Sequence, residues 1–296
     1  MKREIAFVGL GNMGMPMAAN LAKAGYEVHG FDLVPSLRDN AAKEGIRVAA
    51  SLRETINGAD VAITMLPGGK DVLTVWAEAM PYAHKGMLFI DCSTIDAGSA
   101  RRAHELASGA GVLSVDAPVS GGTSGAKAGS LAFMCGAEEA AFAAAKPVLE
   151  KMGGKIIHCG AAGAGQAAKI CNNLILGVSM IATAEAFVLA EKLGLSHQAL
   201  FDAASASSGQ SWSLTSYCPV PGPVPASPAN NGYKPGFTAA LMLKDLKLAQ
   251  EAAASTGAAI PLGAAAAQLY ALYNAGGEGG ADFSGIINMI RGRLPI

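Results

Sequence analysis

The residues that most clearly suggest chemistry form a glycine-rich motif near the start of the chain, Gly9-Leu10-Gly11-Asn12-Met13-Gly14. An apolar run, residues 5–8, precedes the motif, and a helical pattern follows it. A G-x-G-x-x-G sequence between a strand and a helix is typical of dinucleotide-binding proteins. The glycines allow a tight turn and a close approach of the pyrophosphate to backbone N–H groups at the start of the helix. The motif therefore predicts a dinucleotide cofactor.

A carboxylate at the end of the next predicted strand, residues 27–31, indicates which dinucleotide is used. Asp32 lies about 20 residues after the glycines, where an acidic side chain accepts hydrogen bonds from the adenosine ribose. The same carboxylate repels the extra phosphate of NADP, and the next arginine is Arg38. The sequence therefore favours NAD over NADP.

Two further segments follow predicted strands and should border the cofactor. Leu66-Pro67-Gly68 follows residues 61–65, and Ser93-Thr94 follows residues 87–91. In an open parallel sheet, ligands bind beyond the carboxyl ends of the strands. Ordinary strand-end turns have the same composition, so spacing alone leaves both interpretations open.

Ser120-Gly121-Gly122 is a candidate anion site. Adjacent backbone N–H groups that no Cβ obstructs form a concavity that suits a carboxylate. A glycine-rich turn without a ligand is the alternative.

Lys169 and Asn173 are four residues apart in a helical pattern, so they share one helix face. Oxidation of an alcohol to a carbonyl releases a hydride, which NAD accepts, and a proton, which a side chain must accept. Lys169 stands among Ala167, Ala168 and Ile170, and a partly buried lysine can be tuned to a pKa of ~7–8 for this task. A solvated helix lysine is the alternative. The five histidines are scattered without an i, i+4 pair, so no metal site is expected.

The elements that must position these residues change in character along the chain. Short β-type runs alternate with helical patterns up to about residue 160, which predicts a mostly parallel, Rossmann-like sheet with helices on both faces. Residues 166–193 predict one long helix, and helices follow on either side of a proline-rich stretch, residues 218–236. We therefore expect an NAD-binding domain over residues 1–162 and an all-helical substrate and oligomerisation domain, built on that long helix, over residues 163–296.

Composition excludes several classes of protein. The 296 residues are 51% hydrophobic and 15% charged, with a net charge of -1, so neither disorder nor a nucleic-acid or membrane partner is expected. The uninterrupted apolar run at residues 174–184 is too short to cross a bilayer, which needs ~20 residues. Five cysteines without C-x-x-C spacing, together with a start that lacks the apolar core of a signal peptide, predict a cytoplasmic protein.

Over essentially its whole length, the chain resembles the β-hydroxyacid dehydrogenases. The motifs that carry the resemblance are FVGLGNMG at residues 7–14, DCSTI at 91–95, DAPVSGG at 116–122, GQAAKICNN at 165–173, KDL at 244–246 and DFS at 282–284. The proline-rich stretch that runs into Asn230-Asn231 resembles the corresponding stretch in the 3-hydroxyisobutyrate branch of this family.

The resemblance implies roles for particular residues. Lys169 would be the catalytic acid/base, and Asn173 would help to hold the substrate. Ser120, Gly121 and Gly122 would bind the substrate carboxylate. The residues implied at the substrate pocket are Trp212, Tyr217 and Asp245. Those implied to contact the cofactor, besides the glycine motif and Asp32, are Leu66, Pro67, Thr94 and Lys244.

The activity implied is oxidation of 3-hydroxyisobutyrate, or a similar small 3-hydroxy acid, to its semialdehyde with NAD, as in valine and branched-chain amino acid catabolism. The alternatives are a reductase of tartronate semialdehyde or succinic semialdehyde, and a dehydrogenase of L-serine or 3-hydroxypropionate. Decarboxylation of a phosphorylated sugar acid would need a basic cluster that the sequence lacks, and a binding protein of this fold would lack the lysine. The alanine-rich helical domain implies a homodimer or homotetramer.

Overall fold

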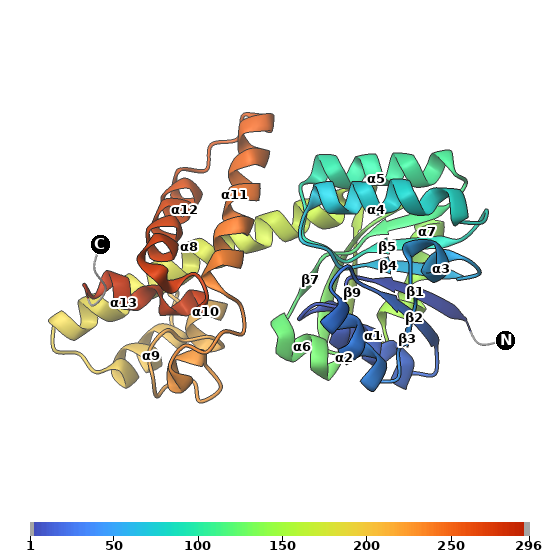
Figure 1. Cartoon of the computed structure of the whole chain (residues 1–296). Helices are drawn as coiled ribbons and strands as arrows, with labels where there is room; N and C mark the ends of the chain where they lie inside the picture. The colour runs from blue at the N-terminus through green and yellow to red at the C-terminus, as the bar shows by residue number, and fades with distance from the viewer. Residues whose placement is uncertain (1–2, 293–296) are drawn as a thin grey trace. The chain divides into compact units, whose positions relative to one another are not determined.

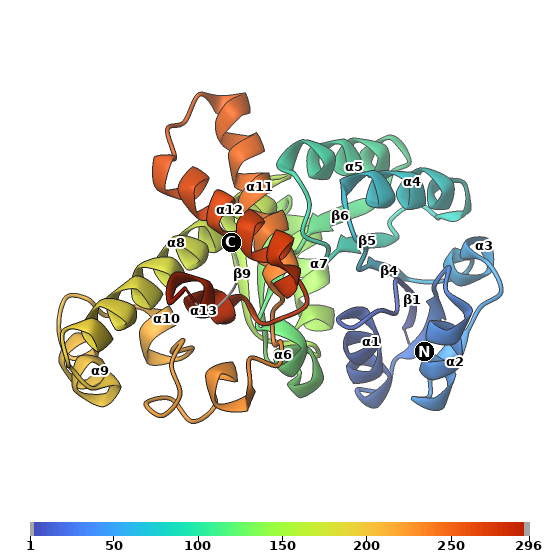
Figure 2. The same ribbon diagram turned by 60° about the vertical axis from the view of Figure 1, so that its left-hand side comes forward.

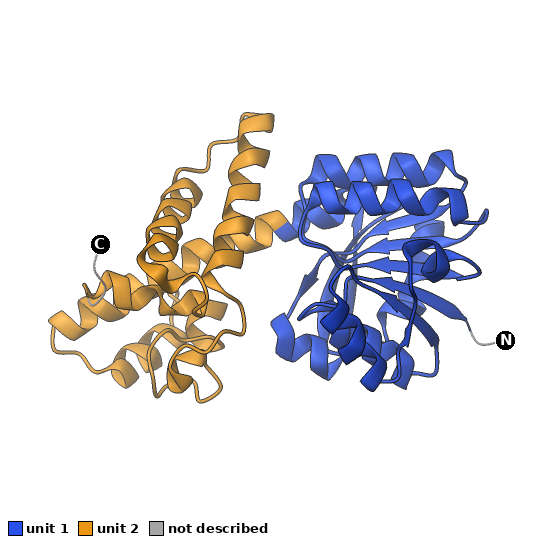
Figure 3. Ribbon diagram, in the orientation of Figure 1, with its two compact units in different colours: residues 1–169 blue, residues 170–296 orange. Residues whose placement is uncertain are grey.

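The structure is a computed structural model that describes residues 3–292; residues 1, 2 and 293–296 lie outside this description. The chain divides into two compact units, residues 1–169 and residues 170–296 (Figure 3). The domain boundary expected after residue 162 lies a few residues before this division, because helix α8 (Ala164–Lys192) begins within unit 1.

Unit 1 is built on one mixed, mostly parallel sheet. Over the described residues the sheet has nine strands in the order β3-β2-β1-β4-β5-β6-β8-β7, with β9 also paired to β8. The strands are β1 (Glu4–Val8), β2 (Glu27–Phe31), β3 (Arg47–Val48), β4 (Val61–Thr64), β5 (Leu88–Asp91), β6 (Leu113–Asp116), β7 (Val119–Ser120), β8 (Leu131–Gly136) and β9 (Gly153–Gly160). From β3 to β6 every pairing is parallel, so these strands end at the same edge of the sheet.

Helices cover both faces of this sheet, as expected from its strands. Along β1 the side chains alternate: Ile5 and Phe7 pack into one buried cluster, and Ala6 and Val8 into another. The helices of unit 1 are α1 (Gly14–Lys23), α2 (Pro35–Lys43), α3 (Leu52–Ile56), α4 (Gly69–Ala79), α5 (Ala97–Gly109), α6 (Gly122–Ala128) and α7 (Glu139–Leu149), with a 3₁₀ turn at Met80–Tyr82. In Figure 1, α4 and α5 lie together along the face of the second cluster. The strands are almost continuously apolar because both faces of the sheet are buried.

Unit 2 is helical, as the sequence predicts. It contains most of α8, then α9 (His197–Ser205), α10 (Trp212–Thr215), α11 (Ala239–Thr256), α12 (Pro261–Tyr273) and α13 (Ile286–Ile290), with short turns at Pro228–Asn231, Asn274–Glu278 and Phe283–Gly285. Helices α11 and α12 lie side by side (Figure 2). The Rossmann-like sheet followed by helices built around a long one confirms the expected fold class.

Helix α8 is longer than its uninterrupted apolar run suggested. By length and composition alone it is long and apolar enough to cross a membrane, which the estimate from residues 174–184 did not allow. Residues 164–173 and 185–192 extend the helix on both sides of the apolar run. Met180, Ala184 and Phe187 are fully buried within unit 2, so this face of α8 forms part of a folded core.

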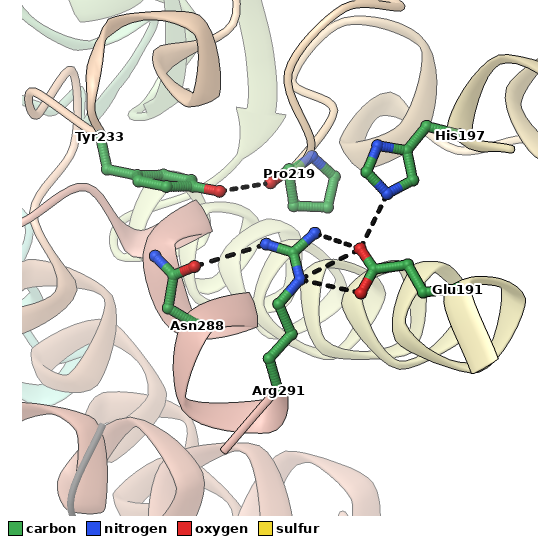
Figure 4. Close-up of polar contacts among 6 residues, drawn as sticks. All are labelled: Glu191, His197, Pro219, Tyr233, Asn288 and Arg291. Atoms are coloured by element: carbon green, nitrogen blue, oxygen red, sulfur yellow. Dashed lines mark hydrogen bonds and ion pairs between the residues drawn. The ribbon is translucent and has the colours of Figure 1, made fainter. Parts of the chain in front are cut away.

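A charged cluster connects three helices of unit 2 (Figure 4). The Arg291 guanidinium, just after α13, donates from Nε to both carboxylate oxygens of Glu191 at 3.1 and 3.2 Å. His197, at the start of α9, contacts the same carboxylate through Nε2 at 2.8 Å. The hydrogen bond from Arg291 lowers the pKa of Glu191. These three residues, which we call the clasp, join the end of α8 to α9 and α13.

Candidate active site

The glycine motif forms a tight turn between β1 and α1. Gly9 has a φ of +95°, and a Cβ there would collide with the carbonyl oxygen of Met65. A Cβ on Gly14 would collide with the Gly9 carbonyl, whereas Gly11 faces open space with no heavy atom within 4 Å of the Cβ position. The turn thus leaves a cradle that a side chain at residue 11 would fill. This geometry fits a pyrophosphate that approaches the start of α1.

Asp32 is fixed beside this turn. Its Oδ2 accepts a hydrogen bond from Leu10 N at 2.8 Å, and its Oδ1 accepts one from Val34 N at 2.8 Å. Each carboxylate oxygen has a second lone pair, so both can still accept a ribose hydroxyl. The Arg38 guanidinium donates to the backbone carbonyl of Asp32 at 2.6 Å, a contact that the sequence did not predict.

A buried network holds the two loops that follow β4 and β5. Ser93 Oγ accepts a hydrogen bond from Leu66 N at 2.8 Å and donates one to Asp91 Oδ1 at 2.6 Å. Thr64 Oγ1 donates to the same Asp91 oxygen at 2.7 Å. Asp91 Oδ2 is buried without a hydrogen-bond partner among the described residues. Burial raises the pKa of Asp91 to about 6. The loops that carry Leu66, Pro67 and Thr94 are therefore tied to each other.

The start of α8 is held by a second buried carboxylate, at the end of β6. Asp116 Oδ1 accepts from Gly163 N at 2.8 Å, and Asp116 Oδ2 accepts from Gln166 N at 2.9 Å. His104 contacts Asp116 Oδ1 at 2.9 Å through Nε2. The fixed first turn of α8 leads directly into the turn that carries Lys169, which is only 6% exposed.

Asn173 lies one turn after Lys169 on α8 and is 1% exposed. Its Nδ2 donates to Asp245 Oδ2, and its Oδ1 accepts from Asn172 at 2.9 Å. Asp245 is buried on α11, next to the half-buried Lys244. The structure therefore joins two of the predicted substrate residues, Asn173 and Asp245, and fixes the orientation of the amide.

The segment Ser120-Gly121-Gly122 connects β7 to α6. Gly121 and Gly122 have φ values of +129° and +61°, which residues with a Cβ rarely adopt. Two consecutive residues of this kind turn the backbone sharply at the start of a helix, where N–H groups lack helical partners. The geometry suits a carboxylate.

Trp212 and Tyr217 form an aromatic stack in unit 2. Their ring centroids are 4.9 Å apart, and Tyr217 also stacks on Phe283 at 5.3 Å. The Tyr217 hydroxyl donates to Asp282 Oδ2 at 2.8 Å, and burial raises the pKa of Tyr217. Trp212 is 52% exposed, so one side of the stack is open to a ligand.

Several residues that build these positions were not recognised from the sequence as site residues. Asp91, Asp116 and Gln166 each lie within a motif of the resemblance, so a signal existed, but nothing in the spacing shows which partners they have. Asp116 and Gln166 bind residues far away along the chain, and Asp91 binds the distant Thr64 as well as the nearby Ser93.

Family models match most of the chain. Residues 4–160 match the NAD-binding domain of 6-phosphogluconate dehydrogenase. Residues 163–290 match the NAD-binding domain of NADP-dependent 3-hydroxyisobutyrate dehydrogenase.

Relatives match along nearly their whole length. A Mycobacterium tuberculosis protein named probable 3-hydroxyisobutyrate dehydrogenase is 55% identical over 289 residues, covering 98% of both chains. A Pseudomonas aeruginosa protein named NAD-dependent L-serine dehydrogenase is 46% identical, covering 95% of this chain and 96% of its own. A solved structure of M. tuberculosis 3-hydroxyisobutyrate dehydrogenase with L-serine has a TM-score of 0.95 and 55% identity, covering 98% of this chain and 100% of its own.

Proposed function

Because this chain belongs to the β-hydroxyacid dehydrogenase family, in its 3-hydroxyisobutyrate dehydrogenase branch, we propose that it oxidises 3-hydroxyisobutyrate to the semialdehyde. The chain is an NAD-dependent hydroxyacid dehydrogenase. In our proposal the reaction serves valine degradation, and Lys169 is the acid/base.

One observation carries the proposal most directly: a buried lysine stands on a turn that is fixed to the cofactor edge of the sheet. Lys169 lies three residues after Gln166, whose backbone N–H is bonded to Asp116 at the end of β6. Burial keeps bulk water away from the Lys169 amine, so a proton can pass between the amine and the substrate hydroxyl. Asn173, one turn further on, supports the orientation of that hydroxyl through its fixed amide.

The chemistry divides between the chain and its cofactor. When bound, NAD supplies the acceptor for the hydride that leaves the carbinol carbon of the substrate. The neutral amine of Lys169 accepts the hydroxyl proton, so the C–H and O–H bonds break and the carbonyl of the semialdehyde forms. Ser120 and the N–H groups of Gly121 and Gly122 hold the substrate carboxylate, which fixes the carbinol carbon at one end of the molecule.

Other groups complete the proposed site. The glycine motif and Asp32 bind the pyrophosphate and the adenosine ribose, and Leu66, Pro67, Thr94 and Lys244 contact the cofactor. In unit 2, Trp212, Tyr217 and Asp245 line the substrate pocket.

L-serine is a second candidate substrate. The Pseudomonas relative is named for its action on L-serine, and the Mycobacterium structure is titled with it. L-serine and 3-hydroxyisobutyrate share a carboxylate and a primary alcohol, and they differ in having an ammonium or a methyl group on the carbon between them. Only the walls of the pocket around that carbon can discriminate between the two.

The test is the rate of NADH formation with 3-hydroxyisobutyrate, L-serine and 3-hydroxypropionate, and the rate of NADH consumption with tartronate and succinic semialdehydes in the reverse direction. We expect kcat/KM for 3-hydroxyisobutyrate to exceed that for L-serine by about tenfold or more, the typical worth of a well-fitted methyl group. A higher kcat/KM for L-serine would make L-serine the substrate. Absence of NADH formation with every hydroxy acid would contradict the proposal as a whole.

We further propose that the chain works as a homodimer or homotetramer in the cytoplasm. The five cysteines are free thiols, which agrees with a reducing compartment. In unit 2, apolar side chains on α8, α12 and the connection after α8 are more than half exposed; they are Ile175, Leu189, Leu193, Leu262 and Leu272. A second subunit that covers them would remove this apolar surface from water.

A further inference from the structure

Gln166 has a buried side chain that the reaction as described does not use. It is 0% exposed, in the first turn of α8. Its Nε2 donates to the Ser93 carbonyl at 2.7 Å, and its Oε1 accepts from Ile95 N at 3.1 Å. The backbone carbonyl of Ser93 can only accept and the N–H of Ile95 can only donate, so these two contacts fix which way the amide faces.

The amide of Gln166 is not needed to begin the helix. The Asp116 carboxylate already accepts from the backbone N–H groups of Gly163 and Gln166. In addition, Ala167 N donates to the Gly163 carbonyl at 3.0 Å. The side chain therefore makes a separate connection, from α8 to the loop between β5 and α5.

That loop is the one proposed to touch the cofactor. Thr94 lies between the two residues that Gln166 holds, and Ser93 Oγ in turn accepts from Leu66 N in the neighbouring loop. One amide thus links the first turn of α8 to the loop after β5 through two buried backbone contacts, and the Ser93 hydroxyl extends this link to the neighbouring loop.

Lys169, the proposed acid/base, follows three residues after Gln166 on the same helix. Residues three apart on a helix are neighbours, about 4.5 Å along the axis. We propose that Gln166 is a positioning residue: its amide sets the distance between Lys169 and the loop that carries Thr94 and is proposed to contact the cofactor. The inference rests on the proposed role of Lys169. It adds that the separation of hydride acceptor and proton acceptor is fixed within unit 1 by this amide.

Gln166→Met is the first test. Methionine keeps the length and helix propensity of glutamine but makes neither hydrogen bond. We expect kcat to fall roughly 10- to 100-fold, because a displacement near 1 Å between reacting groups has an effect of this size. We also expect a larger primary isotope effect with substrate deuterated at the carbinol carbon, and a dissociation constant for NAD within about threefold of wild type.

Val148→Ala is the matched control for lost stability. Val148 is fully buried in α7, in the core of unit 1, and makes no part of this network. We expect it to lower Tm comparably while kcat and the isotope effect stay at wild-type values. Equal losses of kcat in both variants would reduce Gln166 to a stability role and overturn the inference. Wild-type kcat and isotope effect in Gln166→Met would overturn it as well.

Gln166→Glu gives an independent test that does not depend on the methionine variant being stable. A neutral carboxyl group has one acceptor and one donor, as the amide has, but a carboxylate cannot donate to the Ser93 carbonyl. Titratable groups connected to it are Asp116, which binds its backbone N–H, His104, which contacts Asp116, and Asp91, which binds Ser93, while Lys169 lies three residues further on. We expect the ratio of Gln166→Glu to wild-type kcat to rise as pH falls, and a ratio independent of pH would contradict the inference.

The two proposals can fail separately. If Lys169→Ala keeps its activity, the proposed function is wrong and Gln166 has nothing to position. If Lys169→Ala is inactive while Gln166→Met behaves as wild type, only the positioning role is wrong.

Discussion

At the scale of single residues, the side chains around the cofactor edge depend on buried or half-buried carboxylates whose partners are backbone amides and hydroxyls. Asp32 accepts from Leu10 and Val34, Asp91 from Ser93 and Thr64, and Asp116 from the start of α8. Each follows or ends a strand, so loops that are far apart in the chain become fixed at one edge of the sheet.

Asp32 should set the preference for NAD. The double variant Asp32→Ala with Leu33→Arg removes the carboxylate that repels a ribose phosphate and adds a cation that can bind one. Leu33 is 84% exposed, so an arginine there can reach out without displacing core residues. We expect the ratio of kcat/KM for NADP to that for NAD to rise by about tenfold or more. The reading of Asp32 is wrong if the unmodified enzyme already prefers NADP.

Asp91 should make stability depend on pH. Its folded pKa, about 6, is raised from 3.8, so the folded state binds the proton more tightly than the unfolded state. The free energy of unfolding therefore falls as pH rises through this window, by up to roughly 3 kcal/mol. In Asp91→Asn this contribution is absent. Urea unfolding at pH 4.5 and pH 7 should show the wild type losing stability relative to the variant, and a constant difference would contradict the assignment.

At the scale of elements, helix α8 makes structural contacts at its start, middle and end. Its start is bonded to β6 and to the loop after β5, its middle forms part of the core of unit 2, and its end joins the clasp of Glu191, His197 and Arg291. One helix thereby carries both Lys169 and Asn173 at the four-residue spacing that places them on one face.

The clasp of Glu191, His197 and Arg291 should stabilise unit 2 at pH values above the ordinary pKa of a glutamate. Arg291→Met removes charge-assisted hydrogen bonds to Glu191 and should cost about 1–3 kcal/mol of stability near pH 7. The pKa of Glu191 is lowered in the folded state, so this stabilisation is lost as pH falls below 4.5 and through the folded value. Chemical denaturation at pH 7 and pH 3.5 measures both effects. Arg102→Met, which changes an exposed arginine of α5, is the control. Equal effects of the two substitutions would contradict the role of the clasp.

The elements were predictable from the sequence where their patterns are local. Strands with apolar residues on both faces and the long helix follow from periodicity alone. Strand β7 is only two residues long, too short to leave a pattern, and α8 begins two residues before the expected residue 166. That earlier start depends on the carboxylate of Asp116, which no local pattern reveals.

The candidate site was predictable to the same extent. The glycine turn and Asp32 are set by a short stretch of chain, so the sequence could indicate them. The contacts of Gln166 with Ser93 and Ile95, and of Asp91 with Thr64, depend on how distant strands and loops meet in the folded chain. Such contacts carry no periodicity, and only the structure shows them.

At the scale of the whole molecule, exposed apolar side chains on unit 2 predict self-association. Light scattering coupled to size exclusion should give a dimer or a tetramer at micromolar concentration. Replacing Leu193 and Leu262 with glutamate should lower the mass to that of a smaller assembly, because charges desolvated in an interface oppose association. Leu33→Glu, on an exposed leucine of unit 1, should leave the mass unchanged. A strictly monomeric wild-type particle would contradict the proposed assembly.

The central claim is that Lys169 transfers the proton while the cofactor accepts the hydride. The most direct measurement is kcat for NADH formation from 3-hydroxyisobutyrate by wild type, Lys169→Ala and Lys169→Arg, with NAD affinity measured on the same preparations. We predict a kcat lower by ~10²–10⁴ in Lys169→Ala, the typical worth of a positioned acid/base, with NAD affinity nearly unchanged. Lys169→Arg should be as slow, because a guanidinium stays protonated at any working pH. A Lys169→Ala enzyme whose kcat lies within a few-fold of wild type would contradict the claim.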